Sequence, residues 1–233
     1  MLLGGCTTLY RTSPTYEKTL QETKVIGVMP IDVRMYQLKT GHTREEMDKW
    51  STLAQEYITK SLQAQLPQVG AFQIKFIDEA WLREQNSDLW LDNKALFNAV
   101  SGMAATTSFP KEHALFPTKK ETFDYTLGSE AAQLATLCGV DTMLFVSGFD
   151  HDSTTGRMVL GYFNAVIMGT LTGVYYVPVN PSALYMGLVN GNTGSLDWMK
   201  ATPAEAEYSY RNEEHVNTLI EWMLKEFGTN AKK

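Results

Sequence analysis

Residues 134–149 read LATLCGVDTMLFVSGF, and this stretch decides the fold. Residues 134–138 have the composition of a helix end, and Gly139 is a typical helix stop because glycine adopts positive φ without a steric cost. Residues 142–149 form an apolar run bounded by polar residues, as expected of a strand buried in a sheet. A helix that passes through one glycine turn into a buried strand predicts a sheet with helices packed on it.

The chain before this stretch predicts a strand, a helix and a second strand. Lys24–Val33 is a nearly continuous apolar run, typical of a strand covered on both faces, and Pro30 suggests a strand end or a bulge. The sequence TREE at residues 43–46 is a capping box, and apolar residues at helical spacing follow as far as Leu62. Residues 72–76 alternate between apolar and polar. This order predicts a right-handed crossover and parallel pairing.

The middle of the chain is expected to hold helices and one long loop. Asp78–Arg83 has the pattern of a short helix, and Ser87–Ser101 that of a longer helix stopped by Gly102. Met103–Thr126 contains two prolines and is expected to be irregular, with several aromatic residues that pack against the domain. Ser129 is the predicted cap of the helix that ends at Gly139.

The end of the chain predicts a hairpin and a closing helix. Ala183–Val189 and Ser195–Met199 flank the turn NGNTG at residues 190–194, whose asparagines and glycines supply the positive φ of a tight turn. Asn212–Phe227 is apolar along one side. The predicted fold class is α/β: a single domain with a mixed β-sheet, packed helices and a C-terminal β-hairpin followed by a helix.

Composition narrows the possible classes of protein. The chain has 233 residues with no internal break in composition, so residues 24–233 are expected to form one domain. The net charge of −6 repels phosphate backbones, which excludes nucleic acid as an expected partner. Residues 1–23 are interpreted as a lipobox remnant followed by a polar, extended tether. Cys138 is expected to be a buried free thiol, because it lies in an apolar helix turn.

The motif LGGC at residues 3–6 resembles the bacterial lipobox, in which the cysteine is acylated and becomes the first residue. Acylation of Cys6 would attach the chain to a membrane through burial of methylene groups. Thr7 at the following position favours the outer membrane, at its periplasmic face. Because little precedes the motif, we expect an export signal encoded upstream of Met1. The alternative is a chance occurrence of this motif in a cytosolic protein.

Two passages resemble a family of envelope proteins. Residues 134–141 (LATLCGVD), followed by a strand ending in Ser147-Gly148, are similar to the helix–glycine–aspartate–strand passage of bacterial envelope lipoproteins with a TolB-N-terminal-like or CsgG-like domain. Residues 183–198 are similar to their terminal hairpin, although Asn190 replaces the usual aspartate. The resemblance covers residues 24–200 by order of elements. It implies a protein that oligomerises or binds other proteins and is not an enzyme.

One group of polar residues is a candidate ligand site. Asp32 follows the first predicted strand, and Asp150, His151 and Asp152 follow the third, so parallel strands would bring them to one edge of the sheet. Two carboxylates and an imidazole can hold a divalent metal or exchange protons. The simpler interpretation is a solvated turn, and no second histidine or cysteine lies at metal-ligand spacing. Catalytic motifs are otherwise lacking, so no metal, no cofactor and no enzymatic activity are expected.

The run Met158–Val179 carries no formal charge. A helix over residues 157–171 followed by an extended piece is expected, and this helix would be apolar on nearly all sides. Its cover is the core, another subunit or lipid, and the three alternatives remain open. On the second alternative, the residues expected to bind a partner are Tyr162, Phe163, Val166, Ile167, Gly169 and Gly173.

Three functions follow from these patterns. The leading hypothesis is a lipid-anchored periplasmic lipoprotein that binds other envelope proteins, with homo-oligomers possible. The second is a subunit of a CsgG-like outer-membrane secretion channel, in which Met158–Val179 enters the bilayer. The third is a metal-dependent hydrolase built on Asp32, Asp150, His151 and Asp152.

Overall fold

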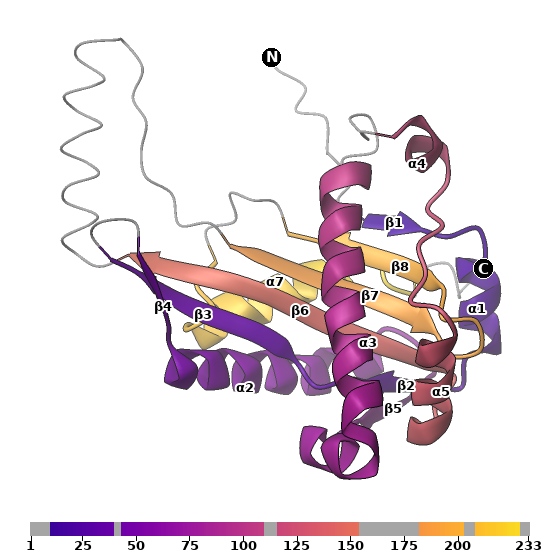
Figure 1. Ribbon diagram of the computed structural model, residues 1–233, viewed down its shortest axis with the longest axis horizontal. Helices are drawn as coiled ribbons and strands as arrows, with labels where there is room; N and C mark the ends of the chain where they lie inside the picture. The colour runs from indigo at the N-terminus through magenta and orange to yellow at the C-terminus, as the bar shows by residue number, and fades with distance from the viewer. Residues whose placement is uncertain (1–9, 40–42, 110–115, 154–181, 203–207, 229–233) are drawn as a thin grey trace.

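The computed structural model describes residues 10–39, 43–109, 116–153, 182–202 and 208–228 (Figure 1). In these residues, eight strands form one mixed sheet in the order β1-β8-β7-β6-β2-β5, and β3 and β4 continue it beside β6. The strands are β1 (Tyr10–Thr12), β2 (Val25–Val28), β3 (Asp32–Leu38), β4 (Arg44–Glu46), β5 (Gln73–Phe76), β6 (Thr142–Ser153), β7 (Ala183–Asn190) and β8 (Leu196–Ala201). The helices are α1 (Tyr16–Glu22), α2 (Asp48–Gln65), the 3₁₀ turn η1 (Leu66–Gln68), α3 (Glu79–Ser108), α4 (Pro117–Glu121), α5 (Ser129–Cys138) and α7 (Glu213–Leu224).

The sheet is built around β6. One edge of β6 pairs antiparallel with β7, from Thr142 opposite Asn190 to Phe149 opposite Ala183. The other edge pairs in parallel first with β2 and then with β3. The predicted single strand over residues 24–33 is therefore two strands, separated at Pro30, which has no N–H to donate to a neighbour. The parallel pairing of β2 with β5 confirms the predicted crossover.

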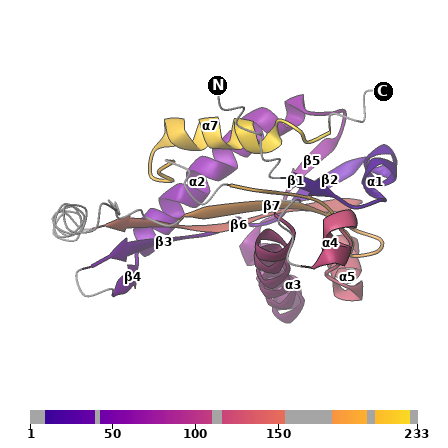
Figure 2. The ribbon, with the colours of Figure 1, turned by 90° about the horizontal axis from the view of Figure 1, so that it is seen from above.

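Helices cover both faces of the sheet (Figure 2). α2 and α7 lie on one face, over a core that includes Ile26, Val33 and Leu144, and α3 and α5 lie on the other, over Met143 and Phe145. Successive side chains of a strand point to opposite faces, so each strand contributes to both apolar layers. This is why the first part of β6 is apolar at every position. The sequence predicted this mixed α/β domain, its closing hairpin and the helix after the hairpin.

Several local predictions are confirmed. α5 ends at Cys138, and Gly139 has φ 64°, with its N–H donating to the carbonyls of Ala135 and Thr136. Cys138 is buried as a free thiol, and burial raises its pKa to about 11. The closing helix α7 begins at Glu213, close to its predicted start, and the Asn212 side chain caps it by accepting from two backbone N–H groups. The predicted cap Ser129 is instead the first residue of α5, which has no side-chain cap. In each confirmed case, the residue that carries the sequence signal lies within a few residues of the groups it contacts.

The capping-box prediction is wrong. Residues 44–46 form β4, which pairs antiparallel with β3, and the helix begins only at Asp48. The backbone of this segment is satisfied by strand pairing, so no helix terminus exists there to be capped. Tertiary context here overrides a local helix signal of a few tenths to about 1 kcal/mol.

The predicted stop at Gly102 and the long loop after it are also wrong. α3 is continuous to Ser108, with a kink at Asn86 that separates the two predicted helices, and α4 forms within the expected loop. Ser101 and Ala104 are fully buried, so the packed side of α3 continues past Gly102. This packing outweighs the roughly 1 kcal/mol that a glycine costs inside a helix.

Residues 10–23 are not an extended tether. β1 pairs antiparallel with β8, and α1 buries Tyr16 and Leu20 in the core on the α2 and α7 side. The fully buried carboxylate of Asp197 holds this segment, because it accepts hydrogen bonds from Ser13 Oγ at 2.6 Å and Thr19 Oγ1 at 2.5 Å. Three of the polar residues that suggested a tether, Ser13, Thr15 and Thr19, are therefore donors to one buried acceptor.

We predict that Asp197→Ala lowers the free energy of unfolding by about 2 to 4 kcal/mol, because it leaves several buried hydroxyl groups without their acceptor. Urea denaturation of the purified protein measures this change. The matched control is Asp124→Ala, whose carboxylate is largely exposed and pairs with Lys119, and which should change stability by less than about 1 kcal/mol. Equal effects of the two substitutions would contradict a structural role for Asp197.

Candidate functional site

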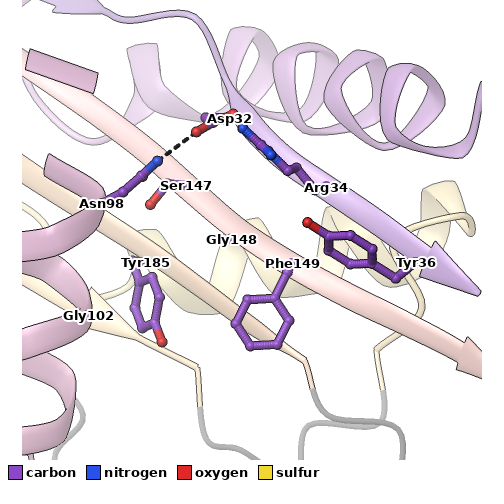
Figure 3. Close-up of a pocket in the computed structure, with 9 residues that line it drawn as sticks. All are labelled: Asp32, Arg34, Tyr36, Asn98, Gly102, Ser147, Gly148, Phe149 and Tyr185. Atoms are coloured by element: carbon purple, nitrogen blue, oxygen red, sulfur yellow. Dashed lines mark hydrogen bonds and ion pairs between the residues drawn. The ribbon is translucent and has the colours of Figure 1, made fainter. Parts of the chain in front are cut away.

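A shallow cavity of about 360 Å³ lies on the α3 side of the sheet, beside α3 itself (Figure 3). Its walls come from three neighbouring strands and from the middle of the helix. Phe149 and Tyr185 stand on its floor, Tyr36 and Arg34 line one side, and Asn98 closes the side toward the helix. The full lining is Asp32, Arg34, Tyr36, Asn98, Gly102, Ser147, Gly148, Phe149 and Tyr185.

Strand alternation places these side chains together. In β3, Val33 and Met35 are fully buried in the core under α2. The residues that alternate with them, Asp32, Arg34 and Tyr36, therefore face the cavity. The same rule in β6 turns Phe149 and His151 toward the cavity side. The register then sets the neighbours, since Tyr36 lies directly opposite His151.

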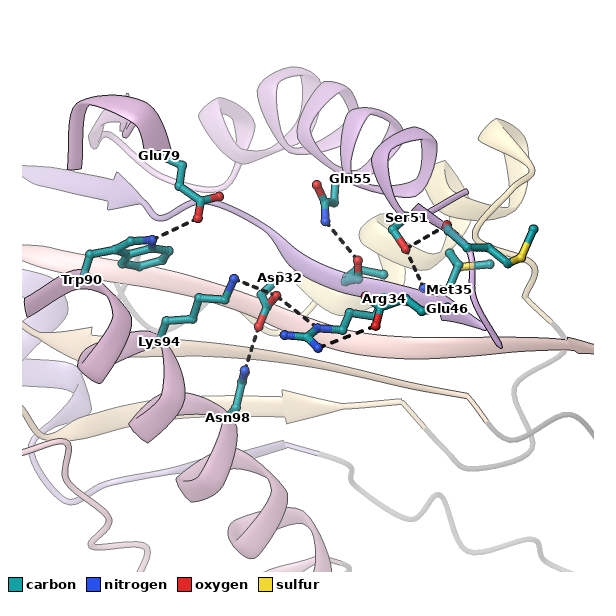
Figure 4. A network of polar contacts seen from close by, with 12 residues as sticks. Asp32, Arg34, Met35, Glu46, Ser51, Gln55, Glu79, Trp90, Lys94 and Asn98 are labelled. Carbon is teal, nitrogen blue, oxygen red and sulfur yellow. Dashed lines mark hydrogen bonds and ion pairs between the residues drawn. The ribbon is translucent and has the colours of Figure 1, made fainter. Parts of the chain in front are cut away.

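Asp32 is the centre of a polar network at the base of the cavity (Figure 4). Its carboxylate is 2.9 Å from Lys94 Nζ and accepts a hydrogen bond of 2.7 Å from Asn98 Nδ2. Arg34 lies farther away, with 3.9 Å between its Nε and Asp32 and 3.9 Å between its Nη1 and Glu46. Asp32 therefore ties α3 to the sheet, while the guanidinium of Arg34 lies within ion-pair distance of both Asp32 and Glu46 and contacts the Tyr36 hydroxyl.

Aromatic rings continue from the cavity along the sheet. Tyr36 stacks on His151 with 5.2 Å between ring centroids, and His151 meets the edge of Phe149 at 5.3 Å. The guanidinium of Arg44 lies 4.9 Å from the centroid of the Tyr36 ring. We call Arg34, Tyr36, Arg44, Phe149, His151 and Tyr185 the arginine–aromatic face.

The predicted ligand site of Asp32, Asp150, His151 and Asp152 is not assembled. The last three residues lie within β6 and not in a solvated turn, so they alternate between the two faces of the sheet. Asp32 pairs with Ser147, whereas Asp150 lies opposite Met35, three positions farther along. In the described part of the chain, no three His, Cys, Asp or Glu side chains are grouped so that they could hold a metal ion.

The side chains of Asp150 and Asp152 lie on the opposite face of the sheet from the cavity. Asp152 pairs with Arg211, and Asp150 accepts a hydrogen bond from the backbone N–H of Tyr210 at 3.3 Å. Burial raises the pKa of Asp150 to about 6, against the lowering effect of that hydrogen bond, and the charge of Asp152 adds to the rise. These contacts fasten the segment before α7 to β6.

Of the residues that line the cavity, Asp32 alone was a predicted site residue. The predicted first strand ended at Val33, so Arg34 and Tyr36 were not expected to lie in a strand beside residues 147–151. The signal was present, because the sequence DVRMYQL at residues 32–38 alternates between polar and apolar over most of its length, as a strand with one buried face does. Asn98 and Tyr185 could not have been assigned, since only the packing of α3 and the β6–β7 register bring them here.

The other predicted functional residues lie outside the described part of the chain. These are Cys6 and the expected partner-binding group of Tyr162, Phe163, Val166, Ile167, Gly169 and Gly173. The secretion-channel alternative depends on the same run and stays a prediction. Within the ranges that the structure describes, no helix is both long and apolar enough to span a bilayer.

No protein-family model and no curated protein sequence matches this chain. Among solved structures it is similar to a PelC dodecamer from Paraburkholderia phytofirmans, at 11% identity over 92% of this chain and 91% of that one, with a TM-score of 0.35. It is also similar to lipoprotein GNA1162 from Neisseria meningitidis, at 11% identity over 88% and 96%, with a TM-score of 0.34. The LpoB C-terminal domain from Salmonella enterica gives 13% identity over 81% and 91%, with a TM-score of 0.28.

Similarities this weak carry no inference about what the chain does. The finer resemblance to TolB-N-terminal-like or CsgG-like domains therefore stays a prediction from residues 134–141 and 183–198. The function has to be argued from the chain's own residues.

We predict that Asp32→Ala lowers the free energy of unfolding by about 2 to 3 kcal/mol, because it leaves Lys94 and Asn98 without their shared acceptor. Thermal and urea denaturation measure the loss. The control is Glu46→Ala, which removes a carboxylate whose side chain is 43% exposed and should cost less than about 1 kcal/mol. If both variants are as stable as the parent, Asp32 does not hold α3 to the sheet.

A second prediction concerns pH. The pKa of Asp150 is about 6 in the folded protein and about 4 in an unfolded chain, so the folded state binds the proton more tightly. Its contribution to stability is complete below pH 4 and is lost as pH rises through 6. Asp150→Asn keeps an acceptor without the charge and should therefore stabilise the protein by about 1 to 2 kcal/mol at pH 7.5, with the gain vanishing near pH 4.

Urea denaturation of parent and variant at both pH values tests this sign. The matched control is Asp152→Asn, which removes the ion pair with Arg211 and should bring no gain at either pH. A loss of stability in Asp150→Asn at pH 7.5 would contradict the prediction.

Proposed function

We propose that this protein is a lipid-anchored protein of the bacterial envelope that acts by binding another protein through its arginine–aromatic face, and that it is not an enzyme. The observation that carries the proposal is the composition of that face. It has three aromatic residues, two arginines and a histidine on one side of a sheet, next to a cavity that can receive a side chain.

Such a face suits protein recognition for a physical reason. Tyrosine and arginine are enriched among the residues that dominate binding energy, because each combines a large contact area with hydrogen-bonding groups. Tyr36 and Tyr185 are half-buried, so their rings are already held in place by the strands beneath them. A partner would therefore lose little conformational entropy from this surface on binding.

Arg34 is the expected polar anchor. Its side chain is 51% exposed, and the two carboxylates near it stand at 3.9 Å, beyond the distance of a good hydrogen bond. A guanidinium has five N–H donors, so beside its contact with the Tyr36 hydroxyl it can still donate to a carboxylate of a partner. We infer that the partner places an acidic group at Arg34 and an apolar side chain in the cavity over Phe149.

The location of the protein rests on the LGGC motif. Acyl chains on Cys6 would hold the protein at a membrane, and more than one chain is needed for stable anchoring. The lipobox and Thr7 support attachment at the periplasmic face of the outer membrane. Mass spectrometry of Cys6 in protein exported by a bacterial host tests this part of the proposal.

The binding face is tested by photo-crosslinking in cells. Benzoylphenylalanine introduced at Tyr36 or at Tyr185 replaces one aromatic ring by another and should give one discrete adduct with a second protein. The same probe at Gln63, which is exposed on α2 on the other side of the sheet, is the control and should give none. Arg34→Glu should reduce the adduct by about tenfold, because it replaces the donor by a repelling carboxylate.

Two results would contradict the proposed face. One is crosslinking at Tyr36 and Tyr185 no stronger than at Gln63. The other is a discrete adduct that does not change with Arg34→Glu in a variant that is folded and present at the parent's level.

A further inference from the structure

The two most exposed large hydrophobic side chains of the described residues lie at one end of the molecule. Met103 is 55% exposed and Phe116 is 54% exposed, whereas Trp81 and Leu91, toward the other end of α3, are 37% and 38% exposed. Met103 belongs to the last third of α3, and Phe116 is the residue that precedes α4. We call Met103 and Phe116 the apolar pair.

The strand that leads to Cys6 is fixed beside this pair. Arg11 of β1 is buried, and its guanidinium donates to the carbonyl of Ser108 at the end of α3 at 2.9 Å. The same guanidinium donates to the carbonyls of Lys119 and Lys120 in α4 at 3.0 and 3.1 Å. Figure 1 shows β1, α4 and the end of α3 together at the top of the molecule. Both segments that carry the apolar pair therefore move with β1.

The distance from the anchor to β1 is short. Four residue steps separate Cys6 from Tyr10, and a fully extended chain spans at most about 14 Å over four steps. A position close to the membrane rests on the proposed acylation of Cys6. An acylated Cys6 lies at the membrane surface, so Tyr10 lies within that distance of the bilayer, and the segments that Arg11 binds lie about one side-chain length from β1. A protein held this closely cannot stand off the membrane.

We propose that the apolar pair contacts the lipid bilayer, with Phe116 and Met103 reaching the boundary between headgroups and acyl chains. Unbranched and aromatic apolar side chains suit that depth. The exposed Lys120, four residues after Phe116 in the last turn of α4, can approach lipid phosphates. Two side chains would not bring a soluble protein to a membrane, but the anchor holds them there at high effective concentration.

This contact fixes the orientation of the whole domain. With the α4 end of α3 against the membrane, the part of α3 after the kink at Asn86 runs away from it over about 33 Å, at 1.5 Å per residue. The α3 side of the sheet then looks sideways along the membrane, as the view in Figure 1 indicates. A partner bound at the arginine–aromatic face would accordingly stand beside this protein on the same surface.

Spin labelling of the acylated, full-length protein tests the proposal. Thr106→Cys places a nitroxide one helical turn from Met103, on the same side of α3, and leaves both apolar side chains in position. Gln63→Cys on α2 is the control. Cys6 is blocked by its acyl groups, and burial of Cys138 raises the pKa of its thiol to about 11, so neither cysteine takes the label at pH 7.

The probe membrane is a vesicle of phosphatidylethanolamine and phosphatidylglycerol, and the readout is nitroxide access to a soluble nickel chelate. Between the unanchored Cys6→Ser protein in buffer and the acylated protein in vesicles, access at position 106 should fall by about threefold or more. Access at position 63 should stay within about 1.5-fold, because α2 lies on the opposite side of the sheet. Replacing both Met103 and Phe116 by aspartate should restore most of the access at position 106.

The outcomes separate this proposal from the proposed function. Equal nickel access at positions 106 and 63 in the acylated protein overturns the membrane contact and leaves the binding face untouched. Access at position 106 that is unchanged by the double aspartate variant also overturns it. An unmodified Cys6 by mass overturns both the anchor and this contact. The crosslinks from Tyr36 and Tyr185 decide the binding face independently.

Discussion

The pairing of β6 along both edges is the constraint on which the rest of the structure depends. Its twelve residues meet β7 on one side and β2 and β3 in succession on the other. The fit is tight, because a Cβ at Gly148 would stand 2.2 Å from the carbonyl oxygen of Ala183 in β7. With β6 fixed, each neighbouring strand has one register, and each side chain has one face.

The two faces of β6 carry different kinds of side chain at its C-terminal end. One face carries Phe149 and His151 beside the cavity, and the other carries Asp150 and Asp152 beneath the segment before α7. A turn could have brought Asp150, His151 and Asp152 together. The strand places His151 on one face of the sheet and the two carboxylates on the other. The same alternation that separates the predicted metal or acid–base group therefore places the arginine–aromatic face on one side of the sheet.

Much of the fold could be predicted, but little of the candidate site could. Asp32 was singled out for its position after an apolar strand, and it proved to be the group that joins α3 to the sheet. Arg34 and Tyr36 required only the correct end of a strand. Tyr185 and Asn98 required the β6–β7 register and the path of α3, because neither has any sequence neighbour among the other lining residues.

The sequence by itself determined the features whose signal and partner lie within one turn of chain. Gly139 ends α5, Asn212 caps α7, and the turn at residues 190–194 joins β7 to β8. Tertiary structure alone decided the features whose stabilising partner is far away in sequence. The acceptor for Ser13 and Thr19 is Asp197, and the strand that pairs with β1 is β8. Local propensities are worth about 1 kcal/mol, whereas a buried acceptor or a paired strand edge contributes several times more, so the distant partner wins.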